Sequence, residues 1–271
     1  MLYRHTARLG VKTIAGALVI VSLSSSSVSS FSHIQYGQYD KSDLGAGEPY
    51  SGDQVGTGTN NEDWGDSYSG RQTGTGVRND CPATAYPLVA LIPDTHWSQT
   101  TQDRPTFWFY VPYTSDQDTF GEFSIEYWNE DASIDDLSEE NYRYDEFSVD
   151  LTNQAGFVSV TLPDSIDPLE PGLDYEWTFK IFCGSQSITP VLVSGWVQFN
   201  DAYTNLPASY DAYIEERIWL DAVNHLAQQR LVRPEDITLV EEWKQLLQSG
   251  GLEPELVPVG PILGELMIDE K

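Results

Sequence analysis

The sequence has 271 residues, of which 14 are Lys or Arg and 42 are Asp or Glu, so its formal net charge is −28 at pH 7. This excess of carboxylates argues against nucleic acid and anionic membrane surfaces as partners, because both are bound through cationic side chains. Aromatic residues make up 12% of the chain and need burial, so we expect a folded domain with a hydrophobic core.

Residues 1–30 are predicted to be a secretory signal peptide. A basic start is followed by an apolar run over residues 13–23 and then by small residues, an order typical of such signals. The apolar run is shorter than the about 20 residues that a membrane-spanning helix needs, so a permanent anchor is the weaker alternative. We expect cleavage near Ser30, no integral membrane span in the mature chain, and a location in the periplasm or at the cell surface.

Residues 31–80 are predicted to be a disordered spacer. They are rich in Gly, Ser, Asp, Asn and Gln and contain few Leu, Ile or Val residues. A segment this poor in aliphatic side chains cannot offset the entropy lost on ordering by burying apolar surface. We interpret it as a flexible connection between the signal peptide and the folded part of the chain.

The chain contains two cysteines, Cys81 and Cys183. An even pair in an exported protein is most simply a disulfide, and the spacing of this pair matches no metal-binding motif. The sequence therefore predicts a Cys81–Cys183 disulfide, with two free thiols as the alternative.

Residues 81–201 are predicted to form one antiparallel β-sandwich domain. Seven short segments rich in aromatic and β-branched residues recur without an intervening helical pattern. These segments are 87–92, 105–113, 120–128, 142–151, 156–162, 173–183 and 191–199. Around the start of the sixth, Leu169, Pro171 and Tyr175 are spaced as in the tyrosine corner of immunoglobulin-like and fibronectin type III-like sandwiches. We therefore expect a mainly β fold of that kind.

Two segments of this domain are candidates for ligand binding. The acidic connection 129–140 could hold Ca²⁺, although its spacing differs from that of an EF-hand loop, and a solvated loop that protects the sheet edge is the alternative. Segment 105–113 is aromatic on both faces, which favours core packing over stacking on a sugar or a peptide.

Residues 205–252 are predicted to form an α-helical hairpin. Apolar residues recur at helical spacing over 210–231, and a second apolar stripe follows Pro234. The apolar face of such a helix pair can be buried only if the pair docks on another element. The remaining residues, 253–271, are rich in Pro and are predicted to be a flexible tail.

The ends of these helices carry recognisable capping residues. Ser209 is expected to cap the first helix. Thr238 and Glu241 are spaced as a capping box for the second, and Gly250 occupies the position at which a glycine commonly ends a helix.

The mature chain shows no catalytic or cofactor-binding constellation. Its histidines lack metal-ligand spacing, and there is neither a phosphate-binding loop nor a nucleophile elbow. Carboxylates are so abundant that a pair suited to glycoside hydrolysis would prove nothing by itself. We therefore assign no catalytic residue and no cofactor, and we consider calcium only as a weakly supported ion.

Several sequence blocks, taken in order, resemble a known family. They are CPATAYPLVALIP (81–93), PTFWFYVPY (105–113), the LEPG–Y–W–C strand, GWV (195–197), IWLDAV (218–223) and EWKQLLQSGGL (242–252). Together they resemble the bacterial, mainly cyanobacterial, domain of unknown function 928 family. The resemblance implies an exported, envelope-associated protein without an established activity. Members of that family usually have Gly before the Ile-Trp pair, where this chain has Arg217.

These features favour an exported, non-catalytic protein of the cell envelope that acts as a binding or structural module. Its partner would be a protein or an envelope polymer. The alternative is a carbohydrate- or calcium-dependent binding protein, and a carboxylate-based hydrolase is the third hypothesis.

Overall fold

The computed structural model describes residues 68–74, 81–115, 119–129, 138, 141–184, 186–203 and 205–268. The predicted signal peptide and most of the predicted spacer lie outside the described residues, as does most of the acidic connection 129–140. Within the part of the chain that is described, none of the helices is long and apolar enough to cross a membrane.

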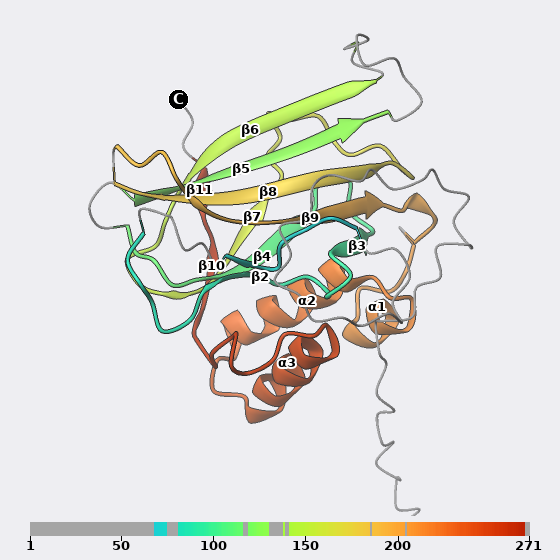
Figure 1. Cartoon of the computed structure of the whole chain (residues 1–271). Coiled ribbons are helices and arrows are strands. Elements are labelled where there is room, and N and C mark those ends of the chain that lie inside the picture. The colour runs from blue at the N-terminus through green and yellow to red at the C-terminus, as the bar shows by residue number, and fades with distance from the viewer. Residues whose placement is uncertain are drawn as a thin grey trace, which may run out of the picture. The chain divides into compact units, whose positions relative to one another are not determined.

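The strands form two mixed sheets, shown in Figure 1. Sheet A has six strands in the order β11 (Met267–Ile268), β6 (Tyr142–Asp150), β5 (Thr119–Trp128), β8 (Asp174–Cys183), β9 (Val191–Phe199) and β3 (Trp97–Thr100). Sheet B has five strands in the order β1 (Thr73–Gly74), β2 (Leu88–Ala90), β4 (Thr106–Val111), β7 (Gly156–Thr161) and β10 (Ile262–Glu265). Each of the seven predicted segments contains one of these strands, so the prediction of a mainly β fold is confirmed.

The expectation of a purely antiparallel arrangement is wrong at two sheet edges. β3 pairs with β9 in parallel, and β10 pairs with β7 in parallel. Both parallel partners are short strands that lack a clear alternating pattern, which is why the sequence did not reveal them. The immunoglobulin-like and fibronectin type III-like detail of the fold stays a prediction.

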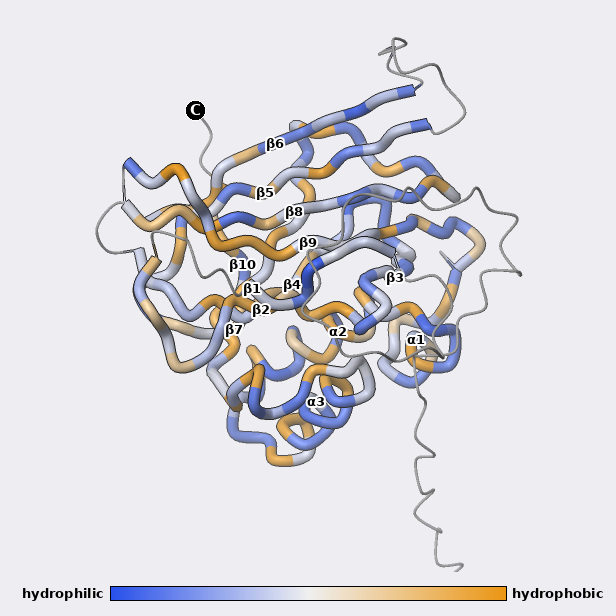
Figure 2. Tube along the Cα trace, in the orientation of Figure 1, coloured by the Kyte–Doolittle hydropathy of each residue, from blue (hydrophilic) through white to orange (hydrophobic). Residues whose placement is uncertain are grey.

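The main core lies between the two sheets. Along β5 and β8 hydrophobic and hydrophilic residues alternate, as Figure 2 shows, and the hydrophobic set faces sheet B. The ring of Trp177 lies 5.4 Å from that of Phe107 and 5.8 Å from that of Phe109, measured between centroids. These aromatic contacts join the sheets, because Trp177 belongs to sheet A whereas both phenylalanines belong to sheet B.

A helical layer covers the other face of sheet B. It consists of α1 (Tyr210–Glu215), α2 (Trp219–Val232) and α3 (Ile237–Ser249), and a short 3₁₀ helix, η2 (Asp201–Tyr203), precedes them. A second core cluster joins Trp108 and Phe157 of sheet B to Trp219 and Trp243 of the helices. β4 is therefore buried on both faces, which explains why the segment 105–113 has no alternating pattern.

The predicted first helix is two helices. α1 ends at Glu215 and α2 begins at Trp219, and between them Arg217 has a φ of 59°, a conformation that a continuous helix does not allow. Ser209 caps α1 as predicted, accepting a hydrogen bond from the backbone N–H of Ala212. The Arg217 conformation accounts for the break, which helical spacing alone did not predict.

The ends of α3 differ partly from prediction. Its N-cap is Asp236, whose carboxylate accepts a hydrogen bond from the backbone N–H of Thr238 at 3.0 Å, so the predicted capping box with Thr238 in the capping position is wrong. Asp is as good a capping residue as Thr and stands two positions earlier. Gly250 is the C-cap, with a φ of −93°, and the next residue, Gly251 with a φ of 77°, takes the left-handed position predicted for Gly250.

The structure also differs from the predicted spacer at residues 68–74. These residues lie along the sheets: Thr73–Gly74 form β1, and Arg71 bridges Ser194 of β9. Tyr68 packs against Trp97 and Trp196, with ring centroids 6.3 and 5.5 Å away. The Tyr68 ring and backbone pairing hold this segment against the sheets. Neither contact requires aliphatic residues.

The predicted flexible tail contains two strands. β10 pairs with β7 at the edge of sheet B, and β11 pairs with β6 at the edge of sheet A. Between them Leu266 is buried, and its backbone N–H donates to the carbonyl of Ser159 at 2.8 Å. In Figure 1 this segment runs from the helical layer past both sheets.

Candidate functional site

A cleft of about 350 Å³ with a mixed polar and apolar lining opens where the edge of sheet A meets the helical layer. Its walls come from the β2–β3 connection and β3, from the end of β9 with η2, and from the turn between α1 and α2. The lining residues are Pro93, Thr95, Trp97, Ser98, Gln99, Asn200, Tyr203, Glu215, Glu216, Arg217 and Trp219. Since three segments distant in sequence build the cleft, no local motif could reveal it.

Backbone strain is concentrated at this cleft. Among the described residues, His96 and Arg217 are the non-glycine residues with positive φ, and both have a φ of 59°. Arg217 lines the cleft, and His96 lies between the lining residues Thr95 and Trp97. Strained non-glycine conformations of this kind persist where surrounding structure holds them and often mark binding sites. Their position here therefore singles out this cleft.

The cleft contains a buried polar atom without a partner. The hydroxyl oxygen of Ser98 has no hydrogen-bond partner among the described residues, and the side chain is only 2% exposed. A buried polar group that lacks a hydrogen bond costs about 1–3 kcal/mol, so such groups call for an explanation. This oxygen is closed off from solvent, so it lies behind the wall of the cleft.

The remaining lining groups are both charged and neutral. Glu215, Glu216 and Arg217 follow one another in the α1–α2 turn, and the amides of Gln99 and Asn200 stand on the sheet side. Burial, together with the nearby Glu216 carboxylate, raises the pKa of the Tyr203 phenol, so this group stays a neutral hydrogen-bond donor and acceptor at physiological pH. The cleft therefore offers donors and acceptors of several kinds within one small volume.

A buried carboxylate holds the two sides of the cleft together. Asp221, in the first turn of α2, is 6% exposed and accepts a hydrogen bond of 2.6 Å from the backbone N–H of Thr101. The hydroxyl of Thr100 donates to the same carboxylate. Burial raises the pKa of Asp221 despite these hydrogen bonds. Through this contact, α2 is fixed to the end of β3.

We expect the strain at Arg217 to be measurable by two substitutions. Arg217→Gly and Arg217→Ala both remove the guanidinium, but only glycine adopts positive φ without cost. The glycine variant should exceed the alanine variant in free energy of unfolding by about 1 kcal/mol, measured by urea denaturation. Equal stabilities would mean that this residue relaxes out of the left-handed region.

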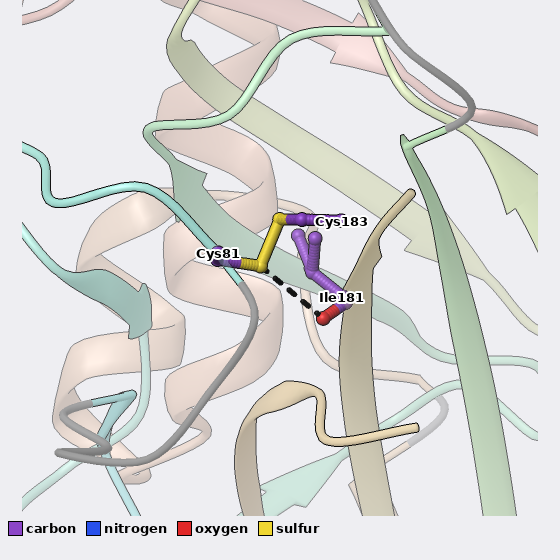
Figure 3. The surroundings of a disulfide bond; sticks show 3 residues. All are labelled: Cys81, Ile181 and Cys183. Atoms are coloured by element: carbon purple, nitrogen blue, oxygen red, sulfur yellow. Dashed lines mark hydrogen bonds between the residues drawn. A yellow bond between two sulfur atoms is a disulfide. The ribbon is translucent and has the colours of Figure 1, made fainter. Parts of the chain in front are cut away.

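The residues predicted from the sequence lie outside the cleft. Cys81 and Cys183 form a disulfide, with their Cα atoms 5.0 Å apart. Figure 3 shows this bond beside Ile181, whose carbonyl oxygen lies 3.7 Å from the sulfur of Cys81. The disulfide ties the start of the domain to the end of β8, so its role is structural.

The residues of the predicted tyrosine corner are also structural. The hydroxyl of Tyr175 accepts a hydrogen bond of 3.1 Å from the backbone N–H of Glu170, five residues upstream. Leu169 is buried, and Pro171 forms a bridge to Phe199 at the end of β9. These contacts anchor the connection that enters β8.

Most of the predicted calcium-binding connection lies outside the described residues. Among the residues that are described, no three His, Cys, Asp or Glu side chains lie close enough together to hold a metal ion.

A close pair of carboxylates does occur, on the face of sheet A that points away from sheet B. Glu126 of β5 and Glu176 of β8 stand directly opposite each other. Burial, followed by the charge of Glu126, raises the pKa of Glu176 to about 7 from its ordinary value of 4.5. Neither glutamate lines the cleft.

This shift predicts a pH-dependent stability. Because the folded-state pKa of Glu176 is the higher one, ionisation disfavours folding, and this destabilisation grows as the pH rises from about 4.5 through about 7. Glu176→Gln should therefore be more stable than the parent by about 1–2 kcal/mol at pH 8, a value reduced for solvent screening. The difference should vanish at pH 4.5. Urea denaturation at both pH values tests this, and a gain of equal size at pH 4.5 would contradict it.

The fold and the cleft define a class of protein: a mainly β protein with two mixed sheets, one of them covered by helices, and a cleft where the helices meet the edge of the other sheet. The sequence matches the family described as Domain of Unknown Function (DUF928) over residues 73–258. Since the match spans more than half of the chain, the protein belongs to this family, and the resemblance noted in the sequence is confirmed. All the residues that line the cleft fall within the matched region. No curated protein matches the sequence.

Proposed function

We propose that this protein is an exported, non-catalytic module of a cyanobacterial cell envelope, located in the periplasm or at the cell surface, and that it binds an envelope polymer through the cleft. The observation that carries the binding role is a cleft that brings charged, amide and hydroxyl-bearing residues together beside two residues with positive φ. Export is supported by the signal-like residues 1–30 and by the disulfide, since disulfides persist in oxidising compartments.

The chemistry of the cleft favours a carbohydrate unit of such a polymer. Sugar hydroxyls both donate and accept hydrogen bonds, and carboxylates, amides and hydroxyls line this cleft together. Trp97, Tyr203 and Trp219 line the cleft as well, beside these polar groups. A cavity of this size and mixed lining is typical of a small-ligand site.

The binding role is tested with soluble polysaccharide released from the envelope of the source bacterium. Calorimetry should detect binding to the full chain, and Ser98→Ala together with Glu216→Gln should weaken it at least tenfold. Ser165→Ala is the matched control, because Ser165 is exposed in the β7–β8 connection and does not line the cleft. Binding that survives both cleft substitutions would reject the cleft as the site.

Export is tested separately by expressing the full chain in its bacterium and determining the N-terminus of the mature protein by mass spectrometry. We expect a mature chain that begins near residue 31, recovered from the envelope fraction. An intact N-terminus on protein recovered from the cytoplasm would reject export without bearing on the cleft.

A further inference from the structure

Among the described residues, no helix packs on the outer face of sheet A. Sheet B packs on its other face, and the helices lie beyond sheet B, as Figure 1 shows. The segment that begins at Tyr68 reaches this outer face at β9 and β3 and at the first residue of β8, Asp174. In the part of the chain that is described, the other outward side chains of β6, β5 and β8 are mostly half-buried or exposed.

Four of these side chains form a row across four strands. Tyr144 of β6 is in register with Glu126 of β5, Glu126 with Glu176 of β8, and Glu176 with Trp196 of β9. Residues directly opposite each other in a sheet have Cβ atoms about 5 Å apart and point to the same face. The row thus places two carboxylates side by side between two aromatic rings, and we call it the Tyr144–Trp196 row.

The carboxylates near this row have donors, whereas the central pair has none among the described residues. Glu122 lies four residues before Glu126 on β5, and its register partner on β8 is Lys180. The Lys180 ammonium nitrogen lies 2.6 Å from a carboxylate oxygen of Glu122. Asp174 accepts hydrogen bonds from Tyr68 and Trp97 at 3.1 and 2.9 Å, and Glu146 accepts one from Tyr144. Glu126 and Glu176 stand opposite each other between Tyr144 and Trp196, although both are half-buried and like charges opposite each other are unfavourable.

We infer that the Tyr144–Trp196 row binds the side chain of an arginine or lysine in a basic segment of a partner protein. At the equivalent place two rows away, the sheet supplies a cation itself, because Lys180 stands opposite Glu122. At Glu126 and Glu176 the opposing residue is a second carboxylate, so a cation that pairs with both would come from a partner. A guanidinium or ammonium placed there contacts both carboxylates at once.

The aromatic ends of the row favour an organic cation over a metal ion. Tyr144 is 45% exposed, and its ring and that of Trp196 flank the carboxylates. Aromatic faces attract guanidinium and ammonium groups and also pack on the methylene groups that carry them. Ca²⁺ instead takes six to eight oxygen ligands, more than a flat sheet face with two carboxylates provides.

The test measures binding of a tetra-arginine peptide with blocked ends to the full chain at an ionic strength of about 0.1 M, which screens long-range attraction. The variant Glu126→Gln/Glu176→Gln should bind at least tenfold more weakly. The control Glu235→Gln/Glu255→Gln removes the same charge from exposed positions of the helical layer and the following turn, and should change the affinity less than twofold. Equal losses in the two variants would show non-specific attraction to an acidic protein and overturn the inference.

A third variant separates the proposed site from a folding effect. Glu176→Lys places an ammonium group opposite Glu126, in the same way that Lys180 stands opposite Glu122. This variant should melt at a temperature no lower than the parent protein. It should also lose binding of the peptide. Peptide binding by a stable Glu176→Lys variant would overturn the inference. Calcium chloride is titrated in parallel, and a calcium affinity that depends on Glu126 and Glu176 without any peptide affinity would assign the row to a metal ion instead.

Discussion

Replacing Cys81 and Cys183 together by serine is expected to lower the free energy of unfolding by about 4 kcal/mol. The disulfide joins residues 102 positions apart, and closing so long a loop removes much of the entropy of the unfolded chain. Both cysteines pack against the core between the sheets, so the loss should be seen over the whole domain as a lower urea midpoint.

Reduction provides the control for this experiment. Dithiothreitol should destabilise the parent by a similar amount and leave the double serine variant unchanged. If reduction does not alter the parent, the disulfide does not stabilise the fold. The result also bears on the compartment, because a domain that depends on this bond for much of its stability requires an oxidising environment.

Trp219→Ala is expected to cost about 3–5 kcal/mol, the largest effect of a single substitution that we predict. Trp219 is 1% exposed, and its indole N–H donates to the carbonyl of Leu91 at 2.8 Å. The substitution leaves a cavity between sheet B and the helices and removes one wall of the cleft. We expect loss of stability in urea and, in the variant that still folds at low temperature, weaker ligand binding.

A second substitution tests this packing from the other side. A Cβ atom at Gly250 would lie 2.3 Å from the Trp219 ring, whereas the backbone at Gly250, with φ −93°, accepts alanine. Gly250→Ala should therefore destabilise the parent by about 1–3 kcal/mol through overpacking. In the Trp219→Ala background the cost should largely disappear, and additive costs in a double-mutant cycle would contradict the proposed contact.

The sequence predicted the strands best where one face of a strand is buried. β5 and β8 alternate along their length, and their inward residues are those the pattern selected. β4 was recognised by its aromatic and β-branched content alone, because helices on one side and sheet A on the other bury both of its faces. Composition therefore predicts such a strand, but not which layer covers each face.

The cleft could not be predicted in the same way. Its polar residues belong to segments around Ser98, Asn200 and Arg217 that only the folded chain brings together. The one local signal was Arg217, which stands where the family resemblance expects glycine, and the structure gives it a positive φ. Arg217 in place of glycine argued against a break between the helices, so this signal was misleading, while the unpartnered Ser98 hydroxyl needed the tertiary structure to be found.

The path of the last described residues has a consequence for when the protein can fold. β10 and β11 complete the edges of two different sheets, pairing with β7 and β6, and they are made after every other strand. Until they are added, β7 and β6 are the outermost strands on that side, and formation of these long-range pairs is slow compared with local folding. A nascent chain therefore lacks these strand pairs until residues 262–268 are synthesised. The last contacts of both sheets thus form only after the rest of the domain has been made.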